Sequence, residues 1–214
     1  GNGTESGHVS IFKNVNGTWT QVGGDINGEF AGDQSGLSVS LSADGSIVAI
    51  GASGNDGNGT ASGHVRIYQN VNNIWTQVGG DINGEAYDAS GWSVSLSADG
   101  SVVAIGAPND GGNGNVSIYK KENNNWIQVG SHIDGEGGYD LSGYSVSLSD
   151  DGSIVAIGAP NNVAAIGVDR FNQYIYKNVG HVRIYKNENN NWTQVGSDID
   201  GKASGDQLGS SVSL

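Results

Sequence analysis

Short runs of apolar residues, alternating in some places and continuous in others, recur along the chain and predict β-strands. Residues 38–41 read Ser-Val-Ser-Leu, which places valine and leucine on one face and serine on the other. Residues 46–52 form a continuous apolar run, typical of a strand that is covered on both faces. An Asp-Gly pair at 44–45 is the signal of a tight hairpin, so these two strands are expected to pair antiparallel.

Two further strands complete the unit. Residues 64–68 read His-Val-Arg-Ile-Tyr, and an asparagine-rich turn connects them to residues 75–79, Trp-Thr-Gln-Val-Gly. The resulting four-stranded antiparallel meander recurs along the chain. Its first strand returns at Ser93–Leu96, Ser145–Leu148 and Ser211–Leu214, and its fourth strand begins at Trp19, Trp75, Trp126 and Trp192.

A single meander of this size cannot bury both of its faces, so the units must stack on one another. Four strands in each unit favour a β-propeller-type repeat module, an all-β fold whose four-stranded antiparallel blades pack face to face. We assign residues 1–214 to one such domain, with complete units at 38–79, 93–130 and 145–196 and partial units at 1–22 and 211–214. The partial units indicate a segment of a longer array.

The order of motifs within a unit is similar to that of a known repeat family. Gly-x-Ser-Val-Ser is followed by Val-Ala-Ile-Gly-Ala-Pro, at Val103–Pro108 and Val155–Pro160, and then by Gly-His-Val-Arg-Ile-Tyr. This order resembles the FG-GAP repeats of integrin α-subunit-like β-propellers over nearly the whole chain. The resemblance implies a propeller with a role in cell adhesion or assembly, outside the cell or on its surface.

Composition and charge narrow the possible partners. Glycine accounts for 37 of the 214 residues, and many of these glycines fall at fixed positions between strands. The formal net charge of -13 repels phosphate groups, which excludes nucleic acid and anionic membrane surfaces as partners. No apolar run is long enough to span a bilayer, so direct membrane insertion is not expected. The chain has no cysteine, which excludes disulfides and cysteine nucleophiles.

The acidic segment after each fourth strand is the candidate metal site. In the first copy, oxygen-bearing side chains stand at relative positions 1, 3, 5 and 9, the spacing of the first part of a calcium loop. The candidate ligands of Ca²⁺, the one cofactor that the sequence suggests, are Asp25, Asn27, Glu29 and Asp33, with Asp81, Asn83, Glu85 and Asp88 in the second copy. The alternative is a polar turn with an inward isoleucine, because Ile26, Ile82, Ile133 and Ile199 recur within the segment.

Residues in variable loops are the candidate ligand contacts. Trp92 occupies a place that the other units fill with Leu37, Tyr144 or Ser210, and an insertion between Pro160 and Gly180 breaks the repeat. Variable loops on a rigid scaffold are where binding sites are normally built. The candidate ligand-binding residues are Trp92, Arg170, Phe171 and Tyr174. An extended hairpin produced by local duplication is the alternative interpretation of the insertion.

The histidines do not indicate a catalytic centre. His8, His64 and His181 share one repeat position, where the remaining copy has Asn115, and His132 stands where the other copies have aspartate. No histidine has a recurring serine and carboxylate partner, and no polar constellation departs from the repeat as a single active site requires. We therefore expect that the chain is not an enzyme.

Together these features predict a non-catalytic, extracellular or cell-surface repeat module for adhesion, protein–protein interaction or structural assembly, with calcium as a stabilising ion. The expected partners are a protein or glycan ligand, or neighbouring copies in an assembly. The competing hypothesis is a carbohydrate-binding, lectin-like propeller that uses loop aromatics such as Trp92 and Tyr174.

Overall fold

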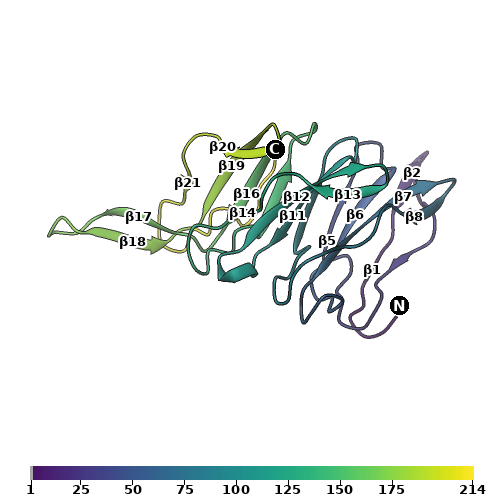
Figure 1. The fold of residues 1–214 in the computed structure, drawn as a ribbon, viewed down its shortest axis with the longest axis horizontal. Helices are drawn as coiled ribbons and strands as arrows, with labels where there is room; N and C mark the ends of the chain where they lie inside the picture. Colours follow the sequence, from purple (N-terminus) through teal and green to yellow (C-terminus); the bar gives the residue numbers. More distant parts are fainter. Residues whose placement is uncertain (1) are drawn as a thin grey trace.

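A computed structural model describes residues 2–214, and it is an all-β structure in which similar sheets follow one another along the long axis (Figure 1). Within these residues the single helical element is a 3₁₀ turn, η1 (Asp110–Gly112), and no helix has the length and hydropathy of a membrane span. The first large sheet contains β5 (Ser38–Leu41), β6 (Ile47–Ala52), β7 (His64–Val71), β8 (Ile74–Gln77) and β9 (Ile82–Asn83).

The same five-stranded arrangement occurs twice more. The second large sheet contains β10 (Ser93–Leu96), β11 (Val102–Ala107), β12 (Asn115–Glu122), β13 (Asn125–Gln128) and β14 (Ile133–Asp134). The third contains β15 (Ser145–Leu148), β16 (Ile154–Ala159), β19 (His181–Glu188), β20 (Asn191–Gln194) and β21 (Ile199–Asp200). Two-stranded pairs are β1 (His8–Val9) with β4 (Ile26–Asn27), β2 (Phe12–Val15) with β3 (Thr18–Gln21), and β17 (Val163–Val168) with β18 (Tyr174–Asn178).

The predicted first hairpin of each unit forms with the expected register. In the second sheet, β10 pairs antiparallel with β11, and Val94 and Leu96 are buried while the intervening serines are half-buried. The Asp-Gly turn is held by its own side chains: Ser97 donates from Oγ to Asp99 over 2.7 Å, and the backbone N–H of Val102 donates to Ser97 Oγ over 3.0 Å. Asp99 is therefore a turn residue, as the Asp-Gly pattern indicates.

Each unit has a fifth strand that the pattern does not predict. The segment after the fourth strand returns to the start of the third, so that β9 pairs with β7 through His64 and Asn83. Ile82 and its equivalents Ile26 and Ile133 are buried, whereas Ile199 is half exposed. The inward isoleucine is thus observed at three copies, and the expected loop contains a short strand.

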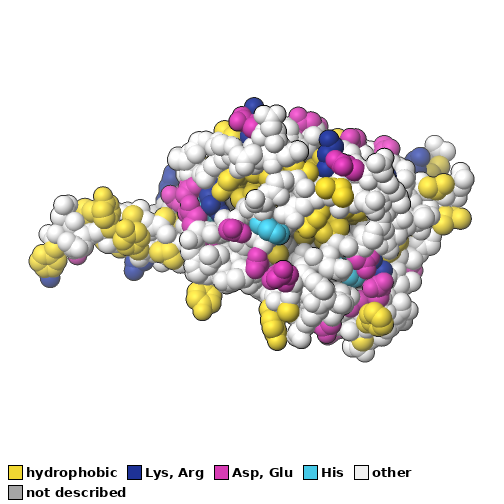
Figure 2. Space-filling model, in the orientation of Figure 1, with side chains coloured by type: hydrophobic (Ala, Val, Ile, Leu, Met, Phe, Trp, Pro, Cys, Tyr) yellow, Lys and Arg dark blue, Asp and Glu magenta, His cyan; other side chains and the backbone are white. Residues whose placement is uncertain are grey.

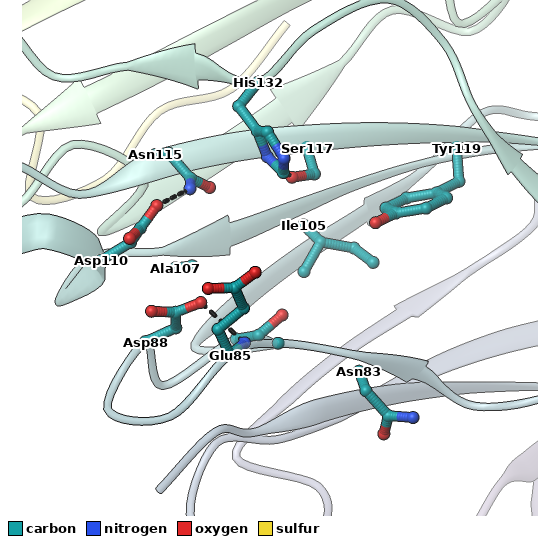
Figure 3. Close-up of a pocket in the computed structure, with 12 residues that line it drawn as sticks. Asn83, Glu85, Asp88, Ile105, Ala107, Asp110, Asn115, Ser117, Tyr119 and His132 are labelled. Atoms are coloured by element: carbon teal, nitrogen blue, oxygen red, sulfur yellow. Dashed lines mark hydrogen bonds between the residues drawn. The ribbon is translucent and has the colours of Figure 1, made fainter. Parts of the chain in front are cut away.

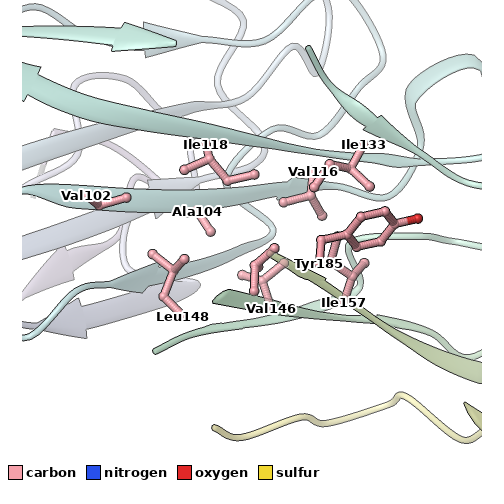
Figure 4. Packing of buried hydrophobic residues seen from close by; sticks show 10 residues of the cluster. Val102, Ala104, Val116, Ile118, Ile133, Val146, Leu148, Ile157 and Tyr185 are labelled. Atoms are coloured by element: carbon pink, nitrogen blue, oxygen red, sulfur yellow. The ribbon is translucent and has the colours of Figure 1, made fainter. Parts of the chain in front are cut away.

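Successive units pack by placing the first strand of one unit on the face of the preceding sheet (Figure 4). Val146 and Leu148 of β15 contact Ala104, Val116 and Ile118 of the second sheet, and all five side chains are at most 9% exposed. We call the interface between two successive units a joint. The recurrent tryptophans form hydrogen bonds across these joints, as Trp192 donates from Nε1 to the carbonyl of Val129 over 2.9 Å. This is propeller-type packing of antiparallel blades, and among residues 2–214 no strand pairing joins the last unit to the first.

The insertion in the third unit is a separate hairpin. β17 and β18 pair antiparallel and project beyond the end of the stacked sheets (Figure 1). The hairpin leaves the order of the third sheet unchanged, because β16 pairs directly with β19.

Candidate functional site

A cavity of about 320 Å³ opens beside the second large sheet, between β11, β12 and the loop that precedes β10 (Figure 3). Acidic side chains gather beside a histidine near the middle of the face shown in Figure 2. The lining contains three carboxyl groups and no lysine or arginine. The residues are Asn83, Gly84, Glu85, Asp88, Ser90, Ile105, Ala107, Asp110, Asn115, Ser117, Tyr119 and His132.

Four of these residues differ from their counterparts in the two flanking units, although the first partial unit also has a serine, Ser10, at the position of Ser117. Asn115 stands where the flanking units have His64 and His181, and Ser117 stands where they have Arg66 and Arg183. Asp110 replaces Asn55 and Asn162, and His132 replaces Asp81 and Asp198. The structure brings all four departures to one cavity, so the expectation that no polar constellation breaks the repeat is wrong.

The arginines occupy the equivalent space in the flanking units. Arg66 is 5% exposed, lies 3.2 Å from the carboxylate of Glu29, and donates to the carbonyl of Asn27 over 3.0 Å. Arg183 makes the same contacts with Glu136 and Asp134. Serine cannot reach as far, and Glu85 has no ion-pair partner within the described residues. The cavity is thus the space that the shorter side chain leaves.

The substitution at position 110 creates a pair of carboxyl groups. Asn55 donates from Nδ2 to Asp33, and Asn162 donates to Asp140, each over 3.1 Å. At the middle joint, between these two, Asp110 faces Asp88, so an amide donor is replaced by a second acid. Burial raises the pKa of the Asp88 carboxyl, and the Asp110 and Glu85 carboxylates raise it further. Asp88 therefore holds its proton more tightly than an isolated aspartate does.

A serine and a histidine lie on the opposite side of the cavity (Figure 3). Ser117 Oγ lies 2.6 Å from Nδ1 of His132, a hydrogen bond in which the tautomer of the ring decides the donor. Ser117 is 8% exposed, while His132 is exposed. Burial raises the pKa of Tyr119, whose hydroxyl therefore remains protonated near neutral pH.

Two carboxylates of the first predicted calcium site accept hydrogen bonds from the chain itself. Asp25 accepts hydrogen bonds from Ser10 and Gln21, each over 2.7 Å. Asp33 accepts from the backbone N–H groups of Glu29 and Phe30 over 2.9 Å. In the second copy, Glu85, Asp88 and Asn83 line the cavity, whereas Asp81 lies elsewhere.

Two other groups of side chains are placed to hold a metal ion. Glu29, His64 and Asp81 bring one ligand atom each within 4.8 Å of one another, and so do Glu136, His181 and Asp198. Each group combines a buried histidine with two carboxylates. Side chains that could hold a metal ion are therefore present, in two groups that include histidine, while calcium itself stays a prediction.

The predicted ligand-binding residues lie apart from the cavity lining. Trp92 packs against Tyr144, with ring centroids 5.6 Å apart. Arg170 and Phe171 lie in the turn of the β17–β18 hairpin, where the guanidinium carbon is 4.7 Å from the ring centroid. Tyr174 lies on β18 and packs against Tyr176. A ligand role for these four residues stays a prediction.

Asp110, Ser117 and Tyr119 were missed as functional residues by the sequence reasoning. The signal was present, because a comparison of copies shows that substitutions at positions 110, 115, 117 and 132 fall within one unit. Only the fold shows that they meet.

No family model and no curated protein matches this chain. Solved structures with similarity to it include two proteins provisionally assigned as 6-phosphogluconolactonases, from Bacteroides fragilis and Bacteroides uniformis. Each is 14% identical, with a TM-score of 0.49, and the matches cover 76% and 91% of this chain. They cover 38% and 65% of the other proteins, so the chain spans less than two thirds of either. This likeness transfers no activity.

The comparison nevertheless corrects the functional expectations. Both similar structures are named as enzymes, and neither is named as an adhesion, integrin-like or lectin-like protein. The predictions of a non-catalytic adhesion module, of a lectin-like alternative and of a chain that is not an enzyme are contradicted. The extracellular or cell-surface location is corrected on the same finding. None of these assignments is retained.

Proposed function

We propose that the cavity is the acid–base site of a hydrolase that cleaves a glycosidic bond in a small, uncharged, hydroxyl-rich substrate. The Asp88–Asp110 carboxyl pair carries this proposal, because it replaces an aspartate–asparagine pair at the joint where the arginine is also absent. Asp110 also accepts a hydrogen bond from Nδ2 of Asn115, which holds its carboxylate beside the cavity.

The carboxyl groups have the two roles that glycoside hydrolysis requires. The raised pKa of Asp88 favours its protonated form, which can donate a proton to the leaving oxygen. Glu85 lacks an ion-pair partner within the described residues, and its carboxylate stabilises positive charge at the sugar carbon or activates a water.

Electrostatics also favours this bond over others. The transition state of glycoside hydrolysis is oxocarbenium-like and carries positive charge, which three carboxyl groups stabilise. Ester or lactone hydrolysis develops an oxyanion, and the lining offers no lysine or arginine to stabilise it. The same lining repels a phosphorylated substrate. The amide and hydroxyl groups of Asn83, Asn115 and Tyr119 supply partners for sugar hydroxyls.

A panel of 4-nitrophenyl glycosides between pH 4 and 8 tests the proposal. We expect turnover that falls about 10²–10⁴-fold in Glu85→Gln and Asp88→Asn. The matched controls are Glu136→Gln and Asp140→Asn, which change the same repeat positions at the next joint and should retain activity. Absence of turnover with every glycoside, or an equal loss in the controls, overturns the proposal.

Two finer hypotheses from the sequence remain proposals. Membership of the FG-GAP family is supported by the motif order, and calcium binding is supported by the spacing of Asp25, Asn27, Glu29 and Asp33. A ligand bound only by the folded chain raises its melting temperature. Thermal melting in millimolar calcium and in chelator therefore tests the second hypothesis, and an unchanged midpoint rejects it.

A further inference from the structure

We propose that the chain binds two Zn²⁺-like divalent transition-metal ions, one at Glu29, His64 and Asp81 and one at Glu136, His181 and Asp198. The two groups are equivalent in the repeat, and each brings its three candidate ligand atoms within 4.8 Å of one another. In the first group, Nδ1 of His64 lies 3.9 Å from Oδ2 of Asp81. The inference is independent of the hydrolase proposal, because it uses other joints of the same repeat.

The buried histidines are the second observation that points to a ligand. His64 and His181 are each 1% exposed. Nε2 of His64 and both ring nitrogens of His181 have no hydrogen-bond partner within residues 2–214. A buried polar nitrogen without a partner is costly and rare in folded proteins. In His181 an ion bound at either ring nitrogen supplies a missing partner, whereas in His64 the nitrogen nearest Asp81 is Nδ1 and not the unpartnered Nε2.

The donor set identifies the class of ion. One imidazole and two carboxylates suit Zn²⁺ and neighbouring first-row divalent ions, whereas calcium takes oxygen ligands. The side chains of Glu29 and Asp81 are 39% and 30% exposed, which leaves a path for the ion and positions for water. Each site would also join successive units, since Glu29 precedes β5 while His64 and Asp81 belong to the sheet that follows.

The positive charges of the arginines beside these groups repel a metal cation and compete for the glutamate oxygens, which lowers the affinity for the ion. Arg66 lies 3.2 Å from one oxygen of Glu29, and Arg183 lies 3.6 Å from Glu136. Each guanidinium is also held by a backbone carbonyl, so the second oxygen of the glutamate can turn to the ion while the arginine stays in place. Binding is therefore expected to be weaker than in a closed four-ligand zinc site.

The middle joint provides an internal negative control. There the histidine position is occupied by Asn115, and Glu85 and His132 do not form a three-residue group with it. His8 occupies the corresponding position in the first partial unit, but it is exposed and belongs to neither group. The geometry thus predicts a stoichiometry of two, rather than one ion for every histidine.

Titration of chelator-treated protein with Zn²⁺, followed by calorimetry, and with Co²⁺, followed by visible absorption, tests the inference. We expect two ions per chain, one in His64→Asn or His181→Asn, and none in the double variant. Asparagine is chosen because Asn115 stands at this position in a folded unit. His8→Asn is the matched control and should still bind two ions.

Several outcomes overturn the inference. They are an unchanged stoichiometry in the double variant, loss of an ion in His8→Asn, or binding of Ca²⁺ in preference to Zn²⁺. Circular dichroism of each variant in chelator checks that the sheets are intact. If a variant does not fold, the wild-type Co²⁺ spectrum decides, since a visible spectrum on saturation that is unchanged from that of aqueous Co²⁺ rejects histidine coordination.

Discussion

Asp110→Asn should stabilise the protein and inactivate it at the same time. The substitution restores the amide found at Asn55 and Asn162, each of which donates to the turn aspartate over 3.1 Å. It also removes one of the carboxylates that raise the pKa of Asp88. A residue selected for packing would not behave in this way, whereas a residue retained for chemistry often lowers stability.

The gain can be estimated from the restored contact. A hydrogen bond to a charged group contributes about 1.5–3 kcal/mol. Asp88 is only half-buried, so solvent screening reduces the expected gain to about 1–2 kcal/mol. For a chain of this size, that corresponds to a rise in melting temperature of roughly 2–8 °C.

The pH dependence separates this explanation from a general effect on the turn. Because the folded chain raises the pKa of Asp88, protonation favours the folded state, and wild-type stability at this site is lost as the pH rises through that pKa. The advantage of Asp110→Asn should therefore be largest at pH 7 and should decrease towards pH 3, where Asp88 is protonated.

Differential scanning fluorimetry from pH 3 to pH 8 gives the measurement. The reciprocal variants Asn55→Asp and Asn162→Asp are the controls, and each should lose about as much stability as Asp110→Asn gains. An unchanged or lower melting temperature for Asp110→Asn at pH 7 would refute the carboxyl-pair interpretation.

Three further substitutions test the fold. A Cβ atom on Gly106 would overlap the carbonyl oxygen of Gly143, so Gly106→Ala should lower the free energy of unfolding, measured in urea, by about 1–3 kcal/mol. Gly80→Ala is the control and should lower it far less, because the space around Gly80 is open. Trp126→Phe removes the 2.9 Å hydrogen bond from Nε1 to the carbonyl of Val78 and should lower the free energy of unfolding by about 1 kcal/mol. The control is Trp19→Phe, because the side chain of Trp19 is 68% exposed. Hydrogen bonds from Ser149 and Ser153 lower the pKa of Asp151 to about 2. The ionised carboxylate therefore stabilises the folded state above pH 4, and this contribution is lost as the pH falls towards 2. Asp151→Asn should remove that acid-dependent component of the unfolding free energy, and a curve parallel to wild type would contradict this.

The strand pattern could be predicted because it depends on local signals. Alternation in Ser93–Leu96 and the continuous run of Val102–Ala107 determine which faces are buried, and the Asp-Gly pair determines the turn between them. The short strand β14 escaped prediction because only two residues pair, and their partners lie in β12, some 18 residues earlier. This pairing forms only because the chain folds back onto β12, and the residues of β14 alone do not indicate that contact.

The candidate site was harder to predict for a related reason. Asp88 and Asp110 are 22 residues apart, and neither is unusual alone, since aspartate and glycine are common in turns. His132 and Asn115 were visible as departures from the repeat, but their common cavity follows from the pairing of β12 with β14. The adhesion hypothesis failed because it transferred a role from motifs that determine packing.

All twelve residues around the cavity lie between Asn83 and His132, which is about one period of the repeat. The site is therefore inherited as a single continuous stretch of sequence, although its walls come from different strands. Duplication of that stretch would copy the complete cavity together with the surfaces that stack it on its neighbours. A tandem array built from it should present identical cavities at regular intervals, which makes this joint a natural module for a multivalent scaffold.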